Sequence, residues 1–116
     1  MDDHVWRWLE PALKAGRDSD TREDIEQQIA TARAQLWLGE GGALVTQLIK
    51  ADQGRFVHCW LGGGSLRALL DMRGGIEAWG RSMGCDFASI DGRKGWDRVF
   101  ARFGYERAGL EMVKRL

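Results

Sequence analysis

His58 is the residue of this sequence whose type and position best suit chemistry near neutral pH. It interrupts the apolar run Phe56–Leu61, and an imidazole can take up and release a proton in that pH range. A histidine on such a strand is also common as a satisfied core residue, so both interpretations stay open. Cys59 and Cys85 have no partners at metal-ligand spacing. We therefore expect no metal site.

The composition is that of an ordinary globular protein, with 44% apolar and 29% charged residues. Seventeen basic and seventeen acidic side chains cancel, which argues against a broad positive surface for nucleic acid or an anionic membrane. No apolar run reaches the roughly 20 residues that span a bilayer, and no signal-peptide pattern is present. With two cysteines, these features predict a cytoplasmic protein with reduced thiols, folded as one domain over residues 1–116.

The first half of the chain changes from helical to strand periodicity. Apolar residues of 4–15 share one helical face, although Pro11 predicts a kink or two shorter pieces. Thr21 to Asp24 fits a capping box that begins a second helix. Three strands with tight turns follow, which predicts an antiparallel meander. We expect these strands over 35–38, 43–50 and 55–61, the last of them central in the sheet because it is apolar on both faces.

The second half alternates helix and strand. We expect a helix from Leu66 to Met83 that breaks or kinks at Gly74-Gly75, with Gly84 as its C-cap. A buried strand over 87–90 and a helix over 93–103 follow, closed by Gly104. The last segment, 105–114, alternates as one final strand. An antiparallel meander followed by a strand-helix-strand crossover predicts a mixed sheet with helices on both faces.

The expected core combines apolar residues from all of these elements. Its members are Ile25, Ile29, Val45, Val57, Leu69, Ile76, Trp79, Phe87, Ile90, Trp96, Val99 and Phe103. Among them we expect Trp96 to fasten its helix to the sheet. Gly92 and Gly95 would let the chain turn sharply into that helix, and Asp91 would cap it.

Four short motifs, Leu36-Trp-Leu-Gly, Gly84-Cys-Asp, Gly92-Arg-Lys-Gly-Trp96 and Gly104-Tyr105, carry a resemblance to a known family. With the order of elements, they make roughly residues 20 to 114 resemble the GNAT superfamily of acyl-CoA N-acyltransferases. Within it, they resemble short GNAT-like proteins of phages and prophages. The resemblance implies an α/β (α+β) fold with a mixed, mostly antiparallel sheet, helices on both faces and the usual first strand missing.

The resemblance also implies a ligand, acetyl-CoA or another acyl-CoA. The family holds its pyrophosphate on a Gln/Arg-x-x-Gly-x-Gly/Ala loop, and no residues here fit that spacing. The segment after the third strand is the nearest substitute, with backbone N–H groups and nearby positive charge. The expected cofactor-binding residues are Gly62, Gly63, Gly64, Ser65, Arg67 and Arg93. Arg73–Gly75 is a second candidate, and a plain flexible connection is the alternative interpretation of the glycines.

The catalytic positions implied by the family differ as well. Phe100 stands where many members have the tyrosine that protonates the departing thiolate, so Tyr105 or a water is the remaining donor. His58 is the expected base for the acceptor amine, with Glu40 as a candidate acting through water. Any acyl transfer should therefore be slow.

Two functions follow from this interpretation. The first is a weak acyl-CoA-dependent N-acyltransferase acting on a small-molecule or protein amine. The second is a catalytically inert GNAT-like module that binds a host or phage protein, as a virion, morphogenesis or host-interaction component. An apolar patch supplied by tryptophans such as Trp6, Trp37 or Trp79 would favour the second function.

Overall fold

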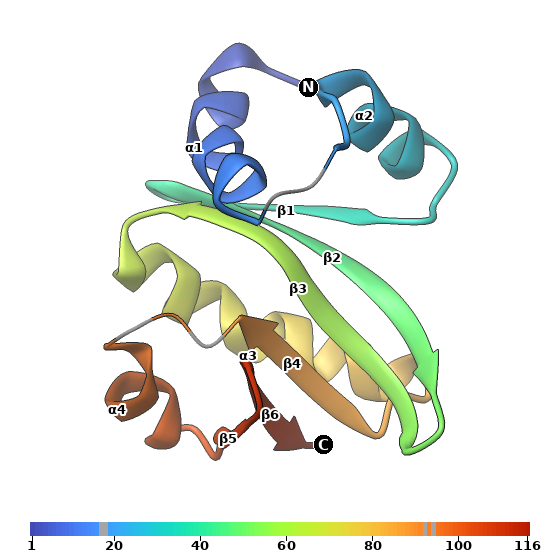
Figure 1. The fold of residues 1–116 in the computed structure, drawn as a ribbon, viewed down its shortest axis with the longest axis vertical. Helices are drawn as coiled ribbons and strands as arrows, with labels where there is room; N and C mark the ends of the chain where they lie inside the picture. Colours follow the sequence, from blue (N-terminus) through green and yellow to red (C-terminus); the bar gives the residue numbers. More distant parts are fainter. Residues whose placement is uncertain (17–18, 92, 94) are drawn as a thin grey trace. The chain divides into compact units, whose positions relative to one another are not determined.

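A computed structural model describes residues 1–16, 19–91, 93 and 95–116, and Figure 1 shows its elements. They follow the expected order with one addition at the end. The elements are α1 (Asp3–Ala15), α2 (Arg22–Ala30), β1 (Gln35–Gly39), β2 (Gly42–Ala51), β3 (Gly54–Gly64), α3 (Leu66–Ser82), β4 (Phe87–Asp91), α4 (Trp96–Ala101), β5 (Glu106–Ala108) and β6 (Glu111–Arg115).

The strands form one six-stranded mixed sheet in the order β1-β2-β3-β4-β6-β5. Strand β3 pairs with β4 in parallel, from Phe56 opposite Phe87 to Cys59 opposite Ile90. The β1–β2, β4–β6 and β5–β6 pairs are antiparallel. The predicted mixed, mostly antiparallel sheet and the inner position of β3 are confirmed.

Local capping signals set the helix ends as the sequence predicts. Thr21 and Asp24 form a reciprocal capping box at the start of α2. After α3, Gly84 has φ +78°, and the Cys85 N–H donates to the Gly80 carbonyl at 2.9 Å. After α4, Gly104 has φ +93°, and the Tyr105 N–H donates to the Phe100 carbonyl at 3.2 Å. Both glycines therefore supply the left-handed residue of a Schellman motif.

The expected breaks in two helices and the expected single last strand are wrong, whereas the alternative of a kink in either helix stays a prediction. Helix α1 runs through Pro11 without interruption, and α3 runs through Gly74 and Gly75 as one helix. Pro11, Gly74 and Gly75 are exposed, and both helices continue through the hydrogen bonds of the neighbouring residues. The expected last strand is a hairpin, because Gly109, with φ +65°, turns the chain between β5 and β6.

The chain divides into two compact units. Unit 1 comprises Met1–Gln47 and Trp60–Gly74, and unit 2 comprises Leu48–Cys59 and Gly75–Leu116. The expectation of one domain stays a prediction.

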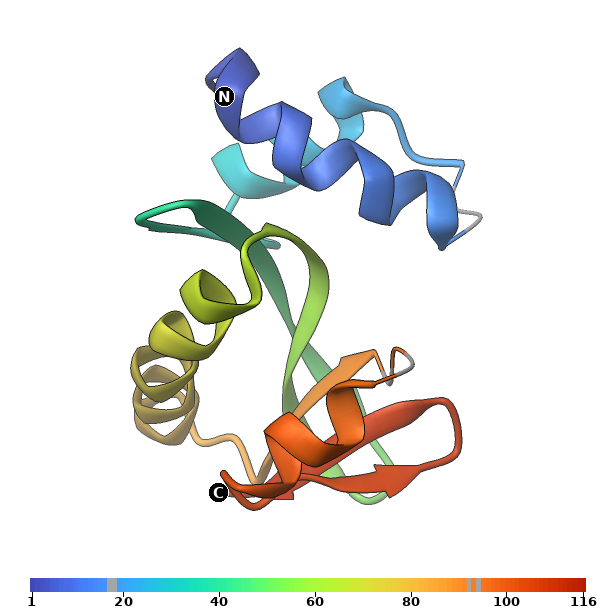
Figure 2. The same ribbon diagram turned by 90° about the vertical axis from the view of Figure 1, so that its left-hand side faces the viewer.

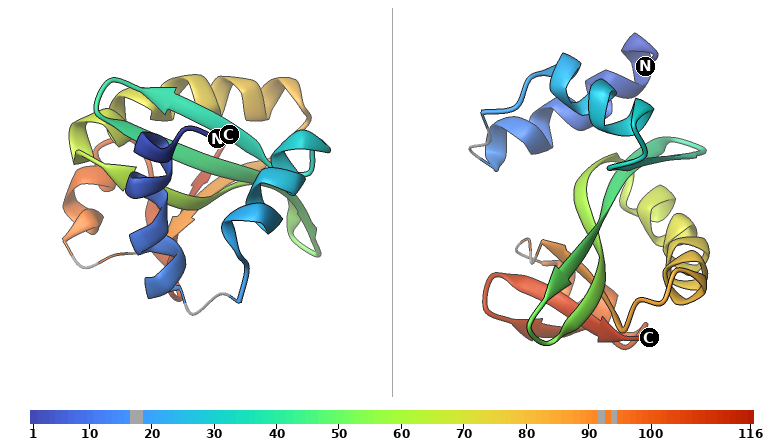
Figure 3. Two further views of the ribbon diagram at one scale, coloured as in Figure 1. Left: turned by 90° about the horizontal axis from the view of Figure 1, so that it is seen from above. Right: turned by 90° about the vertical axis from the view of Figure 1, so that its right-hand side faces the viewer.

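In unit 1, α1 and α2 lie over β1 and β2 (Figures 2 and 3). Their apolar faces and the strands share one buried cluster: Val5, Leu9, Leu13, Ile25, Ala34, Ala43, Val45 and Leu61. The opposite face of these strands is covered by the first half of α3, since Gly62 of β3 faces Leu69. Helices therefore cover both faces of the strands within this unit.

In unit 2, the second half of α3 packs closely on β3, because a Cβ on Gly80 would lie 2.7 Å from the Val57 side chain. The buried apolar side chains of this unit are Val57, Ile76, Cys85, Ala88, Ile90, Phe100, Tyr105 and Met112. Phe100 and Tyr105 thus join a core in which the sequence analysis did not place them.

The predicted core is confirmed for six residues: Ile25, Val45, Val57, Leu69, Ile76 and Ile90. The other six are only half-buried: Ile29, Trp79, Phe87, Trp96, Val99 and Phe103. Helix α4 spans only Trp96–Ala101, so the predicted stripe over 93–103 is too long. Among the described residues, no helix is both long and apolar enough to cross a membrane.

Candidate functional site

His58 lies on β3 in unit 2, with a side chain that is 14% exposed. Its Nδ1 is 2.8 Å from the Ser89 Oγ and 3.3 Å from the Glu111 Oε2. Ser89 comes from β4 and Glu111 from β6, so three neighbouring strands surround one imidazole. The hydroxyl and the carboxylate hold the ring in place.

Tyr105 occupies the other face of the same three strands. Its hydroxyl donates to the Glu77 Oε2 at 2.9 Å, and the Lys114 Nζ donates to the Glu77 Oε1 at 2.7 Å. Lys114 pairs with Ala88, next to Ser89 in the strand, and successive strand residues point to opposite faces. The predicted catalytic side chains His58 and Tyr105 are therefore not brought together.

Glu77 is the buried centre of this second group, at 3% exposure. A carboxylate at that depth needs both a cation and a hydrogen-bond donor, which Lys114 and Tyr105 supply. Phe100 packs against the Tyr105 ring at a centroid distance of 5.4 Å and is 2% exposed. A tyrosine at position 100 would thus place its hydroxyl in a packed core.

Cys59 lies on the same face as Glu77, and its thiol is held protonated. Removal from water, the Glu77 charge and the Asp91 charge, in that order, raise the pKa of Cys59 to about 12. This thiol is consequently a poor nucleophile at neutral pH.

The glycine segment expected to hold a pyrophosphate lies in unit 1 and is largely used by the chain itself. A Cβ on Gly63 would overlap the Trp8 carbonyl of α1, and one on Gly64, which has φ +99°, would overlap the Gly41 carbonyl. The Ser65 N–H donates to the Gly41 carbonyl at 3.0 Å. The Ser65 Oγ accepts from the Ala68 N–H at 3.1 Å and so caps the start of α3. Close backbone packing thus explains Gly63 and Gly64.

The expected cationic residues are both exposed. Arg67, in unit 1, lies 3.9 Å from Asp71 one turn along α3. Arg93, in unit 2, has its guanidinium 4.8 Å above the Trp96 ring. The prediction that Asp91 caps α4 is wrong, since Gly95 is the N-cap and provides no side-chain bond. The turn expected at Gly92 lies outside the described residues.

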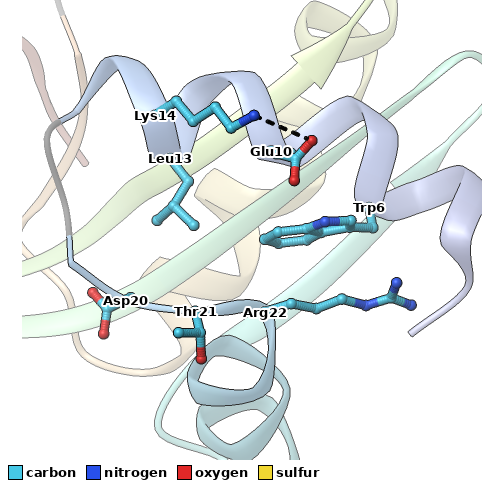
Figure 4. A pocket seen from close by; sticks show the side chains of 7 residues that line it. All are labelled: Trp6, Glu10, Leu13, Lys14, Asp20, Thr21 and Arg22. Carbon is cyan, nitrogen blue, oxygen red and sulfur yellow. Dashed lines mark ion pairs between the residues drawn. The ribbon is translucent and has the colours of Figure 1, made fainter.

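Unit 1 also contains an open pocket of about 320 Å³ beside α1 (Figure 4). Its lining residues are Trp6, Glu10, Leu13, Lys14, Asp20, Thr21 and Arg22. The Arg22 guanidinium lies 5.8 Å from the Trp6 ring and pairs with Asp3 at 2.6 Å. Because two acids and two bases are among its described lining residues, these side chains favour neither anions nor cations.

Sequence reasoning missed the residues that surround His58 and Tyr105. Ser89 and Glu111 are ordinary strand residues, and Glu77 follows the apolar Ile76 in a helix. The available signal was strand alternation, which places Ser89 and Asp91 on one face of β4. The pairing of β4 with β3 and β6 was needed to bring His58 and Glu111 there.

Comparison with known proteins adds the fold. No protein-family model matches the chain, and neither does any curated protein. The chain is similar to a crystal structure, at 1.46 Å resolution, of a GNAT-family acetyltransferase from Listeria monocytogenes 4b F2365. The TM-score is 0.58 at 17% sequence identity, over 98% of this chain and 86% of that one. The fold is GNAT-like.

Proposed function

We propose that this protein is an acyl-CoA-dependent N-acyltransferase that acts on an amine. The observation that carries the proposal is the GNAT-like fold over 98% of the chain, shared with a protein described as an acetyltransferase. The placement of His58 on a central strand, with a hydroxyl and a carboxylate at its ring nitrogen, supports it.

The proposed role of His58 is to take the proton of the attacking amine. Bound acyl-CoA would supply a thioester, whose carbon–sulfur bond breaks as the new carbon–nitrogen bond forms. The proton lost by the amine goes to the imidazole, and Glu111, 3.3 Å from Nδ1, stabilises the resulting cation. A positioned base of this kind contributes about 10²–10⁴-fold.

The start of α3 fits the donor's phosphate groups better than the glycines before it do. Arg67 is exposed there, at the positive end of a 17-residue helix. Gly62 and Gly63 are less suited to hold phosphate, because the space beside their Cα atoms is filled by Leu44 and Trp8. Because the N–H and Oγ of Ser65 are bonded to Gly41 and Ala68, we favour Arg67 here and Arg93 separately in unit 2. Gly64 and Ser65 stay predictions.

A slow reaction remains part of the proposal. The family's tyrosine is replaced by the buried Phe100, and the Tyr105 hydroxyl already donates to Glu77. The CoA sulfur therefore leaves as a thiolate or takes its proton from water. A thiolate is a fair leaving group, so the reaction is slowed rather than prevented.

Two measurements test this function. Acetyl-CoA should raise the melting temperature, and thiol release should be measured with a panel of amines. His58→Gln should lower thiol release about a hundredfold or more, whereas the exposed His4→Gln, the matched control, should leave it unchanged. No melting shift and no thiol release with any amine would contradict the proposal. That outcome would favour the inert GNAT-like module of phage type, which stays a prediction.

A further inference from the structure

Three ligating side chains converge on one face of unit 2. His58, Asp91 and Glu111 each offer a nitrogen or oxygen atom, and these atoms all lie within 4.8 Å of one another. They come from β3, β4 and β6, which are neighbours in the sheet. Because strands rather than loops hold them, their backbones are fixed relative to one another.

The register of the sheet explains the convergence. His58 is opposite Ser89, and Asp91 is opposite Glu111. Ser89 and Asp91 are two residues apart on β4 and therefore share a face. This arrangement places two carboxylates directly opposite each other across an antiparallel pair, which destabilises a sheet unless a cation lies between them.

The distances suit a small divalent ion. In a tetrahedral zinc site with bonds of 2.0–2.1 Å, two ligand atoms lie about 3.3 Å apart. The His58 Nδ1 and the Glu111 Oε2 are separated by 3.3 Å. The Asp91 carboxylate is exposed and can approach both by rotation of its side chain. The Ser89 hydroxyl now bonded to Nδ1 would yield that position to the ion.

We propose that His58, Asp91 and Glu111 form a binding site for a divalent transition-metal ion of the zinc type. One imidazole and two carboxylates favour zinc, cobalt or manganese over magnesium and calcium, which prefer oxygen alone. Three protein ligands leave a coordination position for water or a small ligand. Bound metal would tie three strands together and stabilise the folded chain.

The metal site does not depend on the proposed acyl transfer, but a metal ion bound there would affect that reaction. A metal ion on the imidazole occupies the lone pair that a base requires, so zinc would inhibit an N-acyltransferase that uses His58. Metal binding itself is measured without any acyl-CoA, so its failure and the failure of the proposed function are distinguishable.

The test uses the full chain without a histidine tag, freed of metal with a chelator. Zinc chloride should raise the melting temperature by several degrees, and magnesium chloride at the same concentration should raise it less. Titration with cobalt chloride should give a visible absorption band that zinc abolishes. Glu111→Gln and Asp91→Asn should each weaken zinc binding at least about tenfold, by calorimetry. Glu106→Gln, an exposed carboxylate on neighbouring β5, is the matched control.

Circular dichroism and the metal-free melting temperature establish that each variant is folded. A zinc affinity that is equal in Glu111→Gln, Asp91→Asn and Glu106→Gln would overturn the proposal, because the ion would then bind elsewhere. An absent melting shift in the unsubstituted chain, or one equalled by magnesium, would overturn it as well.

Discussion

The two compact units of this chain are stabilised in different ways. Unit 1 is held by apolar packing and by backbone contacts close enough to require glycine, as where Trp8 meets Gly63. Unit 2 buries an ionised group, Glu77, and satisfies it with Tyr105 and Lys114. It also presents titratable groups around His58 on its other face. Packing thus dominates one unit, whereas the side chains best suited to chemistry gather in the other.

The largest expected effect is in unit 1. Gly63→Val should cost more than about 4 kcal/mol of the free energy of unfolding, because its Cβ would overlap the Trp8 carbonyl. Urea denaturation, or loss of soluble folded protein, measures this. A variant of near-normal stability would show that α1 does not pack on β3 as described. The same steric conflict means that lost acyl-CoA binding in this variant would not locate a binding site.

The next effect concerns the half-buried Cys59 of unit 2. Cys59 should react with iodoacetamide about a thousandfold more slowly in the folded chain than in urea at pH 8, because its pKa is raised from 9.0 to about 12. The unfolded thiol ionises first, so stability should also fall as the pH rises from about 9 to about 12. Peptide mass spectrometry in a Cys85→Ser background follows the labelling. Equal rates in folded and unfolded protein would contradict the raised pKa of this thiol.

The buried ionic group of unit 2 should respond to a change in either partner. Glu77→Gln should cost about 2–3 kcal/mol, because Lys114, only 19% exposed, would lose its counter-charge. The double variant Glu77→Leu with Lys114→Met should recover much of that loss, since it removes both charges. Thermal and urea unfolding compare the three chains. A double variant less stable than Glu77→Gln would show that the group contributes net stability.

The smallest effect serves as the reference for the glycines. Gly74→Ala should stabilise the chain by about 0.5–1 kcal/mol, because no neighbouring atom of the described residues lies within 4 Å of a Cβ added at this helical position. Urea unfolding beside Gly63→Val separates a glycine needed for close packing from one that is not. Destabilisation by Gly74→Ala would indicate that α3 bends or breaks there, as its sequence first suggested.

Local sequence determined the order and the ends of most elements. Thr21 caps α2 and Gly104 ends α4, since capping depends on residues within one turn of the chain. The order of helices and strands, together with short motifs such as Gly104-Tyr105, was sufficient to predict the GNAT-like fold. Local preference failed where a helix continues through a residue that usually ends one, as at Pro11 inside α1.

Only the tertiary structure decided what the functional residues contact. From the sequence, Gly63 looked like part of an anion-binding loop, and the structure places the backbone of α1 against it. His58 and Tyr105 were both expected to be catalytic, yet the sheet separates them onto opposite faces. The approach of Glu111 to His58 depends on how β6 pairs with β4. Strand register joins residues distant in sequence, and no local pattern around either residue encodes that pairing.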